Sequence, residues 1–135
     1  MYLLDTDTLS NLLRRTPSTK LIGKLASVPV EQQFTSSITL GELFYGAHRL
    51  KAQSGALLER LEQRLLPNLP VLPFDDVAAR RYGELRASLE ATGVLIGDAD
   101  LRIAAIALSR NLAVVTGNVR HFRQVPGLVV ENWLL

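Results

Sequence analysis

Cysteine is absent from the 135-residue sequence, so disulfide bonds, thiolate metal ligands and a cysteine nucleophile are all excluded. This absence suits a reducing compartment, and we expect a cytoplasmic protein. Long apolar runs are also missing. No uninterrupted apolar segment approaches the roughly 18 residues that a membrane-spanning helix needs. The first residues carry no basic stretch and reach an acid at Asp5, which is not typical of a secretory signal peptide. We therefore expect no membrane segment and no secretion.

The residues that are present indicate one globular domain. Apolar residues make up 47% of the chain and charged residues 21%, which is ordinary for such domains. We expect one domain over residues 1–135, burying about two-thirds of its unfolded surface. Fifteen basic residues exceed thirteen acidic ones, and five of the acids lie in or beside the candidate site below: Asp5, Asp7, Glu42, Asp98 and Asp100. A basic surface around an acidic pocket suits a polyanionic substrate bridged by metal, although the charge alone equally fits a mildly basic protein without such a partner.

Short apolar runs alternate with segments of helical periodicity along the whole chain. Strands are predicted at residues 2–4, 33–36, 71–74, 113–116 and 128–130. Helices are predicted at 8–15, 20–28, from about 37, 53–66, 77–91, 98–108 and in a short piece ending at 122. Pro17 is expected to open the second helix and Asp75 to cap the fifth. Apolar strands that alternate with helices indicate a parallel sheet covered on both faces. We predict an α/β domain with a central parallel sheet of four to five short strands.

The helix that follows Gly97 is almost entirely apolar but begins with two acids, Asp98 and Asp100. Apolar residues recur at helical spacing after Asp100, which predicts burial on most sides of this helix. Both acids are favoured by the helix dipole. Because residues two positions apart cannot share a helix face, we expect Asp98 near the N-cap and Asp100 directed at a site.

Other polar residues also stand near the ends of predicted strands. In open parallel sheets, ligands bind outside the carboxyl ends of the strands, and right-handed crossovers bring such ends together. Clustered carboxylates repel one another and lose hydration, so they persist mainly where a cation offsets that cost. Oxygen ligands without His or Cys favour Mg²⁺ or Mn²⁺, which can activate a water for attack on a phosphodiester. The residues concerned are Asp5 after the first strand, Glu42 after the second, Asp98 and Asp100 before the fourth, and Asn118 after it.

Each of these residues also has a purely structural interpretation. Asp5 or Asp7 is a suitable N-cap for the first helix. Thr39 and Glu42 fit the capping-box pattern, in which the two side chains satisfy the first turn of a helix. Asn118 is an ordinary turn or N-cap residue. The sequence leaves these alternatives open.

Four segments together resemble the PIN-domain family and, within it, the VapC-type toxins of bacterial type II toxin–antitoxin pairs. They are LLDTD at 3–7, SITLGELFYGA at 37–47, IGDADLRIAA at 96–105 and VTGNVRHF at 115–122. The resemblance implies a PIN-like three-layer fold and a Mg²⁺- or Mn²⁺-dependent endoribonuclease. It also implies a homodimer that a small cognate antitoxin inhibits.

The resemblance further implies roles for individual residues. Asp5, Glu42 and Asp100 are the three principal acids, and Asn118 occupies a fourth position where relatives often have Asp. Asn118 is therefore expected to position a ligand water or the substrate. The role of Asp98 is left open, and we count it among the candidate metal ligands. Asp7 stands where relatives often have Asn, so we do not count it.

The remaining polar residues are predicted from charge and position. Plausible phosphate contacts are Arg14, Arg15, Arg102 and Arg120, although solvated surface charge is the ordinary alternative for each. His48 and His121 lack triad partners at recognisable spacing, so surface or capping roles are expected.

Two other functions compete with RNA hydrolysis. Asp5–Thr6–Asp7 imitates the opening motif of haloacid-dehalogenase-type phosphatases, but that chemistry needs a later lysine and the last lysine here is Lys51. A non-catalytic PIN-like module that only binds RNA or protein is the second alternative. It gives no reason to keep the electrostatic cost of clustered acids. We therefore predict hydrolysis of RNA phosphodiesters by a metal-activated water.

Overall fold

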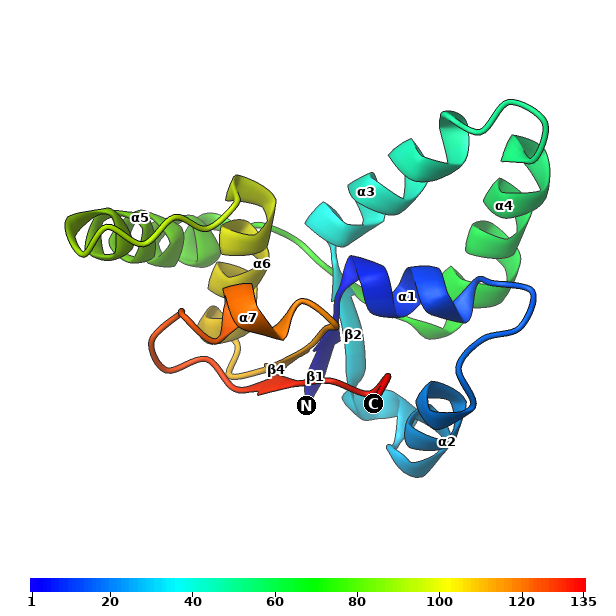
Figure 1. Ribbon diagram of the computed structural model, residues 1–135, viewed down its shortest axis with the longest axis horizontal. Coiled ribbons are helices and arrows are strands. Elements are labelled where there is room, and N and C mark those ends of the chain that lie inside the picture. Colours follow the sequence, from blue (N-terminus) through cyan, green and yellow to red (C-terminus); the bar gives the residue numbers. More distant parts are fainter.

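A five-stranded parallel sheet forms the centre of the computed structural model, which describes residues 1–135 (Figure 1). The strands are β1 (Tyr2–Leu4), β2 (Gln33–Ser36), β3 (Val71–Leu72), β4 (Ala113–Val115) and β5 (Val130–Glu131). Their order is β3-β2-β1-β4-β5, and every neighbouring pair is parallel. β1 is therefore the central strand, with Leu3 opposite Phe34 of β2 and Val114 of β4. The predicted parallel sheet is confirmed.

Helices cover both faces of the sheet (Figure 1). One side carries α1 (Thr6–Leu12), α2 (Thr19–Ser27), α3 (Ser37–His48) and α4 (Ser54–Arg60), and a π-helical turn, η2 (Leu61–Leu65), extends α4. The other side carries α5 (Asp76–Ala91), α6 (Asp98–Ser109) and α7 (Val119–Phe122). Two short 3₁₀ turns, η1 (Val30–Gln32) and η3 (Leu66–Asn68), precede β2 and β3.

Two hydrophobic cores separate the three layers. Leu3 and Val114 face the core beneath α5 and α6, whereas Leu4 and Val115 face the core beneath α1 to α4. This alternation follows from the two-residue period of a strand, which sends successive side chains to opposite faces. α6 buries most of its apolar residues in the first core, as its composition predicts. Both faces of β1 and β4 are covered by helices, which explains why the sequences of these two strands are apolar throughout.

Several predicted boundaries are corrected by local bonding. The first helix begins at Thr6 and ends at Leu12, earlier than predicted at both ends, because the chain turns into it directly after Asp5. Pro17 does not open α2, because Ser18 is the N-cap before Thr19 and its side chain accepts a hydrogen bond from the Leu21 backbone N–H at 3.3 Å. β5 starts later than predicted, at Val130, where it pairs with Val114 of β4. The predicted cap at Asp75 is confirmed by its bond to the Ala78 N–H.

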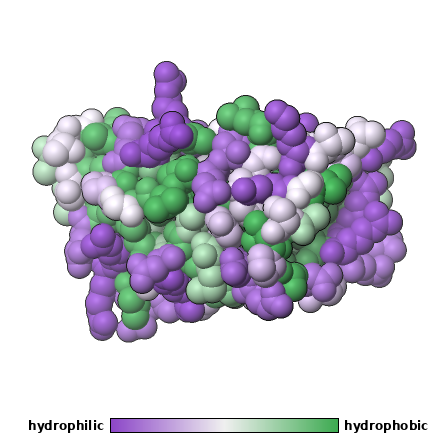
Figure 2. All heavy atoms as spheres, turned by 90° about the horizontal axis from the view of Figure 1, so that it is seen from below, coloured by the Kyte–Doolittle hydropathy of each residue, from purple (hydrophilic) through white to green (hydrophobic).

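Figure 2 shows the molecule from below, the side on which β1 and β2 begin in Figure 1. Hydrophobic atoms appear there in several patches that hydrophilic atoms separate. No helix of the chain combines the length and the apolar character that crossing a membrane requires. The acids described next lie at the opposite, carboxyl ends of the strands.

Candidate active site

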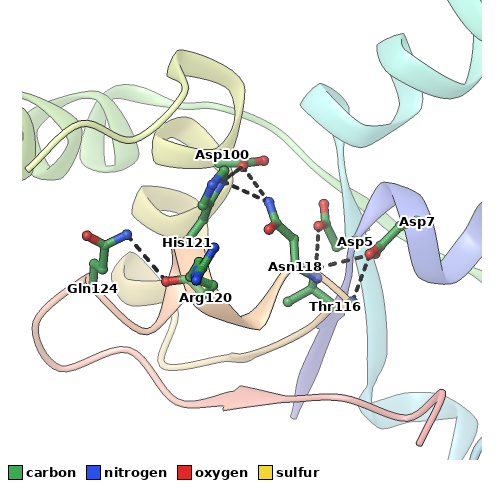
Figure 3. Close-up of polar contacts among 9 residues, drawn as sticks. Asp5, Asp7, Asp100, Thr116, Asn118, Arg120, His121 and Gln124 are labelled. Atoms are coloured by element: carbon green, nitrogen blue, oxygen red, sulfur yellow. Dashed lines mark hydrogen bonds and ion pairs between the residues drawn. The ribbon is translucent and has the colours of Figure 1, made fainter.

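The carboxyl ends of β1 and β4 form the switch point of the sheet. From β1 the chain adds β2 and β3 on one side, and later β4 and β5 on the other. Such points are where ligands bind in open α/β sheets. Asp5 directly follows β1 and Thr116 directly follows β4, and the Thr116 hydroxyl donates to Asp5 Oδ2 at 2.8 Å (Figure 3). The prediction that these strand ends meet is therefore confirmed.

Asp5 is the buried carboxylate of this site. Its side chain is only 4% exposed, and Oδ1 is the one buried side-chain nitrogen or oxygen atom of the chain without a hydrogen-bond partner. Burial raises the pKa of Asp5 to about 6. Hydrogen bonds from the Thr6 backbone and Thr116 oppose this rise, whereas the charges of Asp7 and Asp100 add to it. Asp5 therefore has neither a full hydrogen-bond shell nor a positive partner.

Asp100 is held by two residues of the segment after β4 (Figure 3). The Asn118 amide nitrogen donates to Asp100 Oδ2 at 3.2 Å, and His121 Nδ1 lies 3.5 Å from the same oxygen. Asn118 Nδ2 and His121 Nδ1 are themselves 3.0 Å apart. The predicted acid and the predicted amide thus meet directly.

Glu42 reaches the site through Thr6. The Thr6 hydroxyl donates to Glu42 Oε1 at 2.7 Å, across the contact between α1 and α3. Thr6 follows Asp5 in the chain, so this bond brings Glu42 alongside the segment that carries Asp5. Glu42 lies within α3 rather than at its start.

The structural alternatives for these residues are not realised. Asp5 and Asn118 occupy the N-cap positions of α1 and α7, yet neither side chain makes a capping hydrogen bond. The capping box predicted for Glu42 is wrong, because Ser36 caps α3 by accepting from the Thr39 N–H at 3.0 Å. Elsewhere, Ser18 and Asp75 do cap their helices. The side chains of Asp5, Glu42 and Asn118 are therefore free of the local role that most often explains such residues.

Asp98 is separate from these acids. The Tyr82 hydroxyl donates to its Oδ1, and Arg102 Nε donates to its Oδ2 at 2.8 Å. These bonds lower the pKa of Asp98, the Tyr82 bond most. Gly97 holds the N-cap position of α6 and Asp98 follows it, so Asp98 lies near the N-cap as expected, but its side chain makes no capping hydrogen bond. With both oxygens engaged by α5 and α6, Asp98 leaves our set of metal ligands.

The arginines predicted to contact phosphate differ in whether they already pair with an acid of the protein. Arg14 and Arg15 line a cavity of about 750 Å³ between α1, α3 and α4, and Glu42 lines the same cavity. Arg102 is bonded to Asp98, and its guanidinium lies 5.0 Å from the Phe74 ring centre and 4.9 Å from that of Tyr82. Arg102 is therefore already paired, and we no longer count it as a phosphate contact.

The donor set suits a hard divalent cation. No three acidic or histidine side chains stand close enough together to form a complete metal centre. However, the partnerless Asp5 Oδ1 is an oxygen for which the protein supplies no donor, and unpaired buried carboxylates are stabilised by cations. Asp5, Asp100 and Glu42 offer carboxylate oxygens only, the ligands that Mg²⁺ and Mn²⁺ prefer.

Three residues of the site were missed by sequence reasoning. Thr6 and Thr116 fix Glu42 and Asp5, and His121, expected at the surface or in a cap, contacts Asp100. The only sequence signal for the threonines is their position, because each is a hydroxyl residue within two positions of the end of β1 or β4. His121 stands one helical turn beyond Asn118, a spacing that places both side chains on one face.

Comparison with known proteins gives one consistent family. Residues 2–128 match the family model described as PIN domain. A protein named tRNA(fMet)-specific endonuclease VapC, from Salmonella typhimurium, is 36% identical over 98% of this chain and 97% of its own. Two solved structures are also similar.

The first is FitAcB from Neisseria gonorrhoeae, with a TM-score of 0.90 and 34% identity over 98% of each chain. The second is VapBC2 from Rickettsia felis bound to a promoter DNA fragment, with a TM-score of 0.88 and 31% identity over 98% of each chain. The family model and these relatives each cover nearly the whole chain. The chain belongs to the PIN-domain family, with VapC ribonucleases among its relatives.

Proposed function

We propose that this protein is a Mg²⁺- or Mn²⁺-dependent endoribonuclease and the toxin of a toxin–antitoxin pair. The observation that carries the proposal is Asp5, a buried carboxylate with a partnerless oxygen and a pKa raised to about 6 beside Asp100. A structural protein gains nothing from this arrangement, because an unpaired buried acid destabilises the fold. A bound cation would offset the repulsion between these acids and would attract a polyanionic substrate.

Asp5, Asp100 and Glu42 would hold the cation. When bound, the cation supplies Lewis-acid activation of water and stabilises the leaving oxygen of the phosphodiester. The surrounding residues orient the acids: Thr116 fixes Asp5 Oδ2, Asn118 fixes Asp100 Oδ2, and Thr6 fixes Glu42. Asp5 Oδ1 is left for the cation. His121 lies beside Asp100 and helps to orient it.

The RNA backbone would approach over the cavity between α1, α3 and α4. Arg14 and Arg15 line this cavity together with Glu42, so positive charge continues directly from the acids. Arginine side chains at such a position bind phosphates and fix the strand without reading its sequence. Arg120 in α7 is exposed on the other side of the site and is a second phosphate contact.

The named relatives support the partners. One is called a tRNA(fMet)-specific endonuclease, and the similar structures are titled FitAcB and VapBC2. We extend three properties to this chain: an RNA substrate with transfer RNA as the first class to test, a small cognate antitoxin, and a homodimeric state. We place the activity in the cytoplasm, where RNA and a newly made antitoxin are available. A short reading frame beside the gene is the expected source of the antitoxin.

The proposal is tested with purified protein freed of antitoxin. Structured RNA is incubated with the protein in EDTA, Mg²⁺ or Mn²⁺, and the products are separated on a denaturing gel. We expect cleavage with either metal and none in EDTA. Asp98→Asn serves as a matched control for Asp5→Asn and Asp100→Asn, since it removes an acid from the same region but outside the site. RNA binding by the wild type without any cleavage would instead support the non-catalytic binding module.

A further inference from the structure

The turn between β4 and α7 is held by a carboxylate that the proposed function does not use. Asp7 Oδ2 accepts a hydrogen bond from the Gly117 backbone N–H at 2.8 Å (Figure 3). Asp7 Oδ1 lies 3.3 Å from the Thr116 hydroxyl. Asp7 and Gly117 are 110 positions apart in the chain. The first turn of α1 is thus bonded directly to the segment that carries Asn118.

Gly117 leaves the space that this bond requires. A Cβ atom at position 117 would lie 2.6 Å from Asp7 Oδ2, well inside van der Waals contact. Only Gly93 and Gly127 among the glycines have positive φ angles, so the backbone conformation of Gly117 does not itself require glycine. The requirement comes from the close approach of the Asp7 carboxylate.

The bonded turn leads to the residues that orient both catalytic acids. The Asn118 N–H donates to the Thr116 hydroxyl at 2.9 Å, and that hydroxyl donates to Asp5. The Asn118 side chain donates to Asp100. A displacement of this turn therefore moves the groups that fix Asp5 and Asp100 together, and small displacements of positioning groups are costly in catalysis.

We infer that Asp7 is a positioning residue, which locks the 116–118 turn against α1 through Gly117 and so holds Asn118 against Asp100. The Gly117 bond occupies Asp7 Oδ2, so the role that we assign to Asp7 is to hold the turn rather than to ligate the cation. The kinetic part of this inference rests on the proposed ribonuclease function, whereas the lock itself does not.

The lock is tested first by a double-mutant cycle of melting temperatures in metal-free buffer. Asp7→Ala removes the bond, and Gly117→Ala introduces the clash, so each lowers the melting temperature. The double variant is expected to melt at the temperature of Asp7→Ala alone, because removal of the carboxylate also removes the clash. Asp76→Ala, which removes an exposed first-turn acid of α5, should combine additively with Gly117→Ala. Additive losses in the Asp7 cycle would overturn the lock.

The positioning role is tested by RNA cleavage at increasing Mn²⁺. Asp7→Ala should lower kcat about tenfold, a size typical of residues that orient ligands, with half-saturating Mn²⁺ unchanged within about twofold. Asp7→Asn keeps an oxygen that can accept from Gly117, so it should restore kcat to within about twofold of wild type. An increase in half-saturating Mn²⁺ in both variants would make Asp7 a ligand and overturn the inference, as would an unchanged kcat in Asp7→Ala. If the wild type cleaves no RNA, the proposed function fails while the melting cycle still decides the lock.

Discussion

The first turn of α6 carries two carboxylates in opposite surroundings. Asp98 is exposed, is bonded to Tyr82 and Arg102, and has Arg86 at 4.0 Å. Asp100 faces the other way, toward Asn118 and His121, and no arginine or lysine pairs with it. The protein therefore places arginines beside Asp98, whereas its neighbour two positions away meets an amide and an imidazole.

The same contrast appears in the pKa values. Hydrogen bonds to Tyr82 and Arg102 hold the pKa of Asp98 below its ordinary value, whereas burial raises that of Asp5 to about 6. An acid that the protein has already paired serves structure. Acids that are buried or grouped without a counter-charge are the ones prepared for an external cation. These surroundings distinguish the paired Asp98 from the acids for which we propose a catalytic role, a distinction that their spacing along the chain cannot make.

The largest expected effect is on cleavage. Asp5→Asn and Asp100→Asn should each lower the initial rate at least about a thousandfold, since loss of a metal ligand removes several kcal/mol of transition-state stabilisation. Asp98→Asn should retain the rate within about tenfold. Initial rates on one RNA at saturating Mn²⁺ provide the measurement. Equal losses at positions 98 and 100 would erase the distinction between the two acids.

The second prediction concerns stability without metal. Asp5 has a folded pKa of about 6 against 3.8 in the unfolded chain, so its charged form destabilises the fold at pH 7 and is relieved as the pH falls through 6. Asp5→Asn should raise the free energy of unfolding by up to about 3 kcal/mol at pH 7.5. This gain should shrink steadily toward pH 4, where the wild-type acid is protonated in the folded state. Urea unfolding in EDTA across this pH range measures it, and a gain independent of pH would contradict the assignment to Asp5.

The third prediction is metal-dependent stabilisation. A cation bound only by the folded protein stabilises it by about 2.7 kcal/mol when present at a hundred times its dissociation constant. The melting temperature of wild type and of Asp98→Asn should therefore rise with Mn²⁺. That of Asp100→Asn should rise much less, because a ligand is missing. Ca²⁺ and Mg²⁺ titrations serve as comparisons, and an equal response of all three proteins would show that the ion binds elsewhere.

The smallest expected effect concerns arginines, which also divide into residues with and without an acidic partner. Arg14→Gln combined with Arg15→Gln should raise the KM for RNA about tenfold and reduce its salt dependence, because two free phosphate contacts are lost. Arg102→Gln, whose guanidinium is already paired with Asp98, should change neither by more than about twofold. Cleavage rates between low and moderate salt measure both quantities. A stronger effect at Arg102 would show that its ion pair opens to receive RNA.

Much of this fold is predictable because its strands are short, apolar and separated by periodic helices. The switch-point rule then places Asp5 and Asn118 together without knowledge of any contact. The start of α3 was not predictable, because its sequence contains more than one residue suited to capping, Ser36 and Thr39 among them. The structure shows that Ser36 is the N-cap, since its side chain accepts from the Thr39 N–H.

The two acids of α6 illustrate a second limit. Their spacing correctly predicts that the two side chains point in different directions. It does not predict which residues each side chain contacts. The partner of Asp98 is Tyr82, which comes from α5, and the packing of α5 on α6 is set by side chains of the whole core. The role of Thr116 is hidden for the same reason, because its acceptor Asp5 lies 111 positions away.

The central position of β1 has a consequence for synthesis. The strand that starts the chain must wait for β4, whose Ala113 pairs with Tyr2, before Asp5 receives its bond from Thr116. Contacts between such distant segments form late in folding, and a ribosome makes only about 5–20 residues each second. A nascent chain that lacks β4 and the residues after it has no Thr116 to bond Asp5 and no Asn118 to bond Asp100, so the proposed site is not yet assembled. The proposed activity would therefore begin only after the last strands emerge.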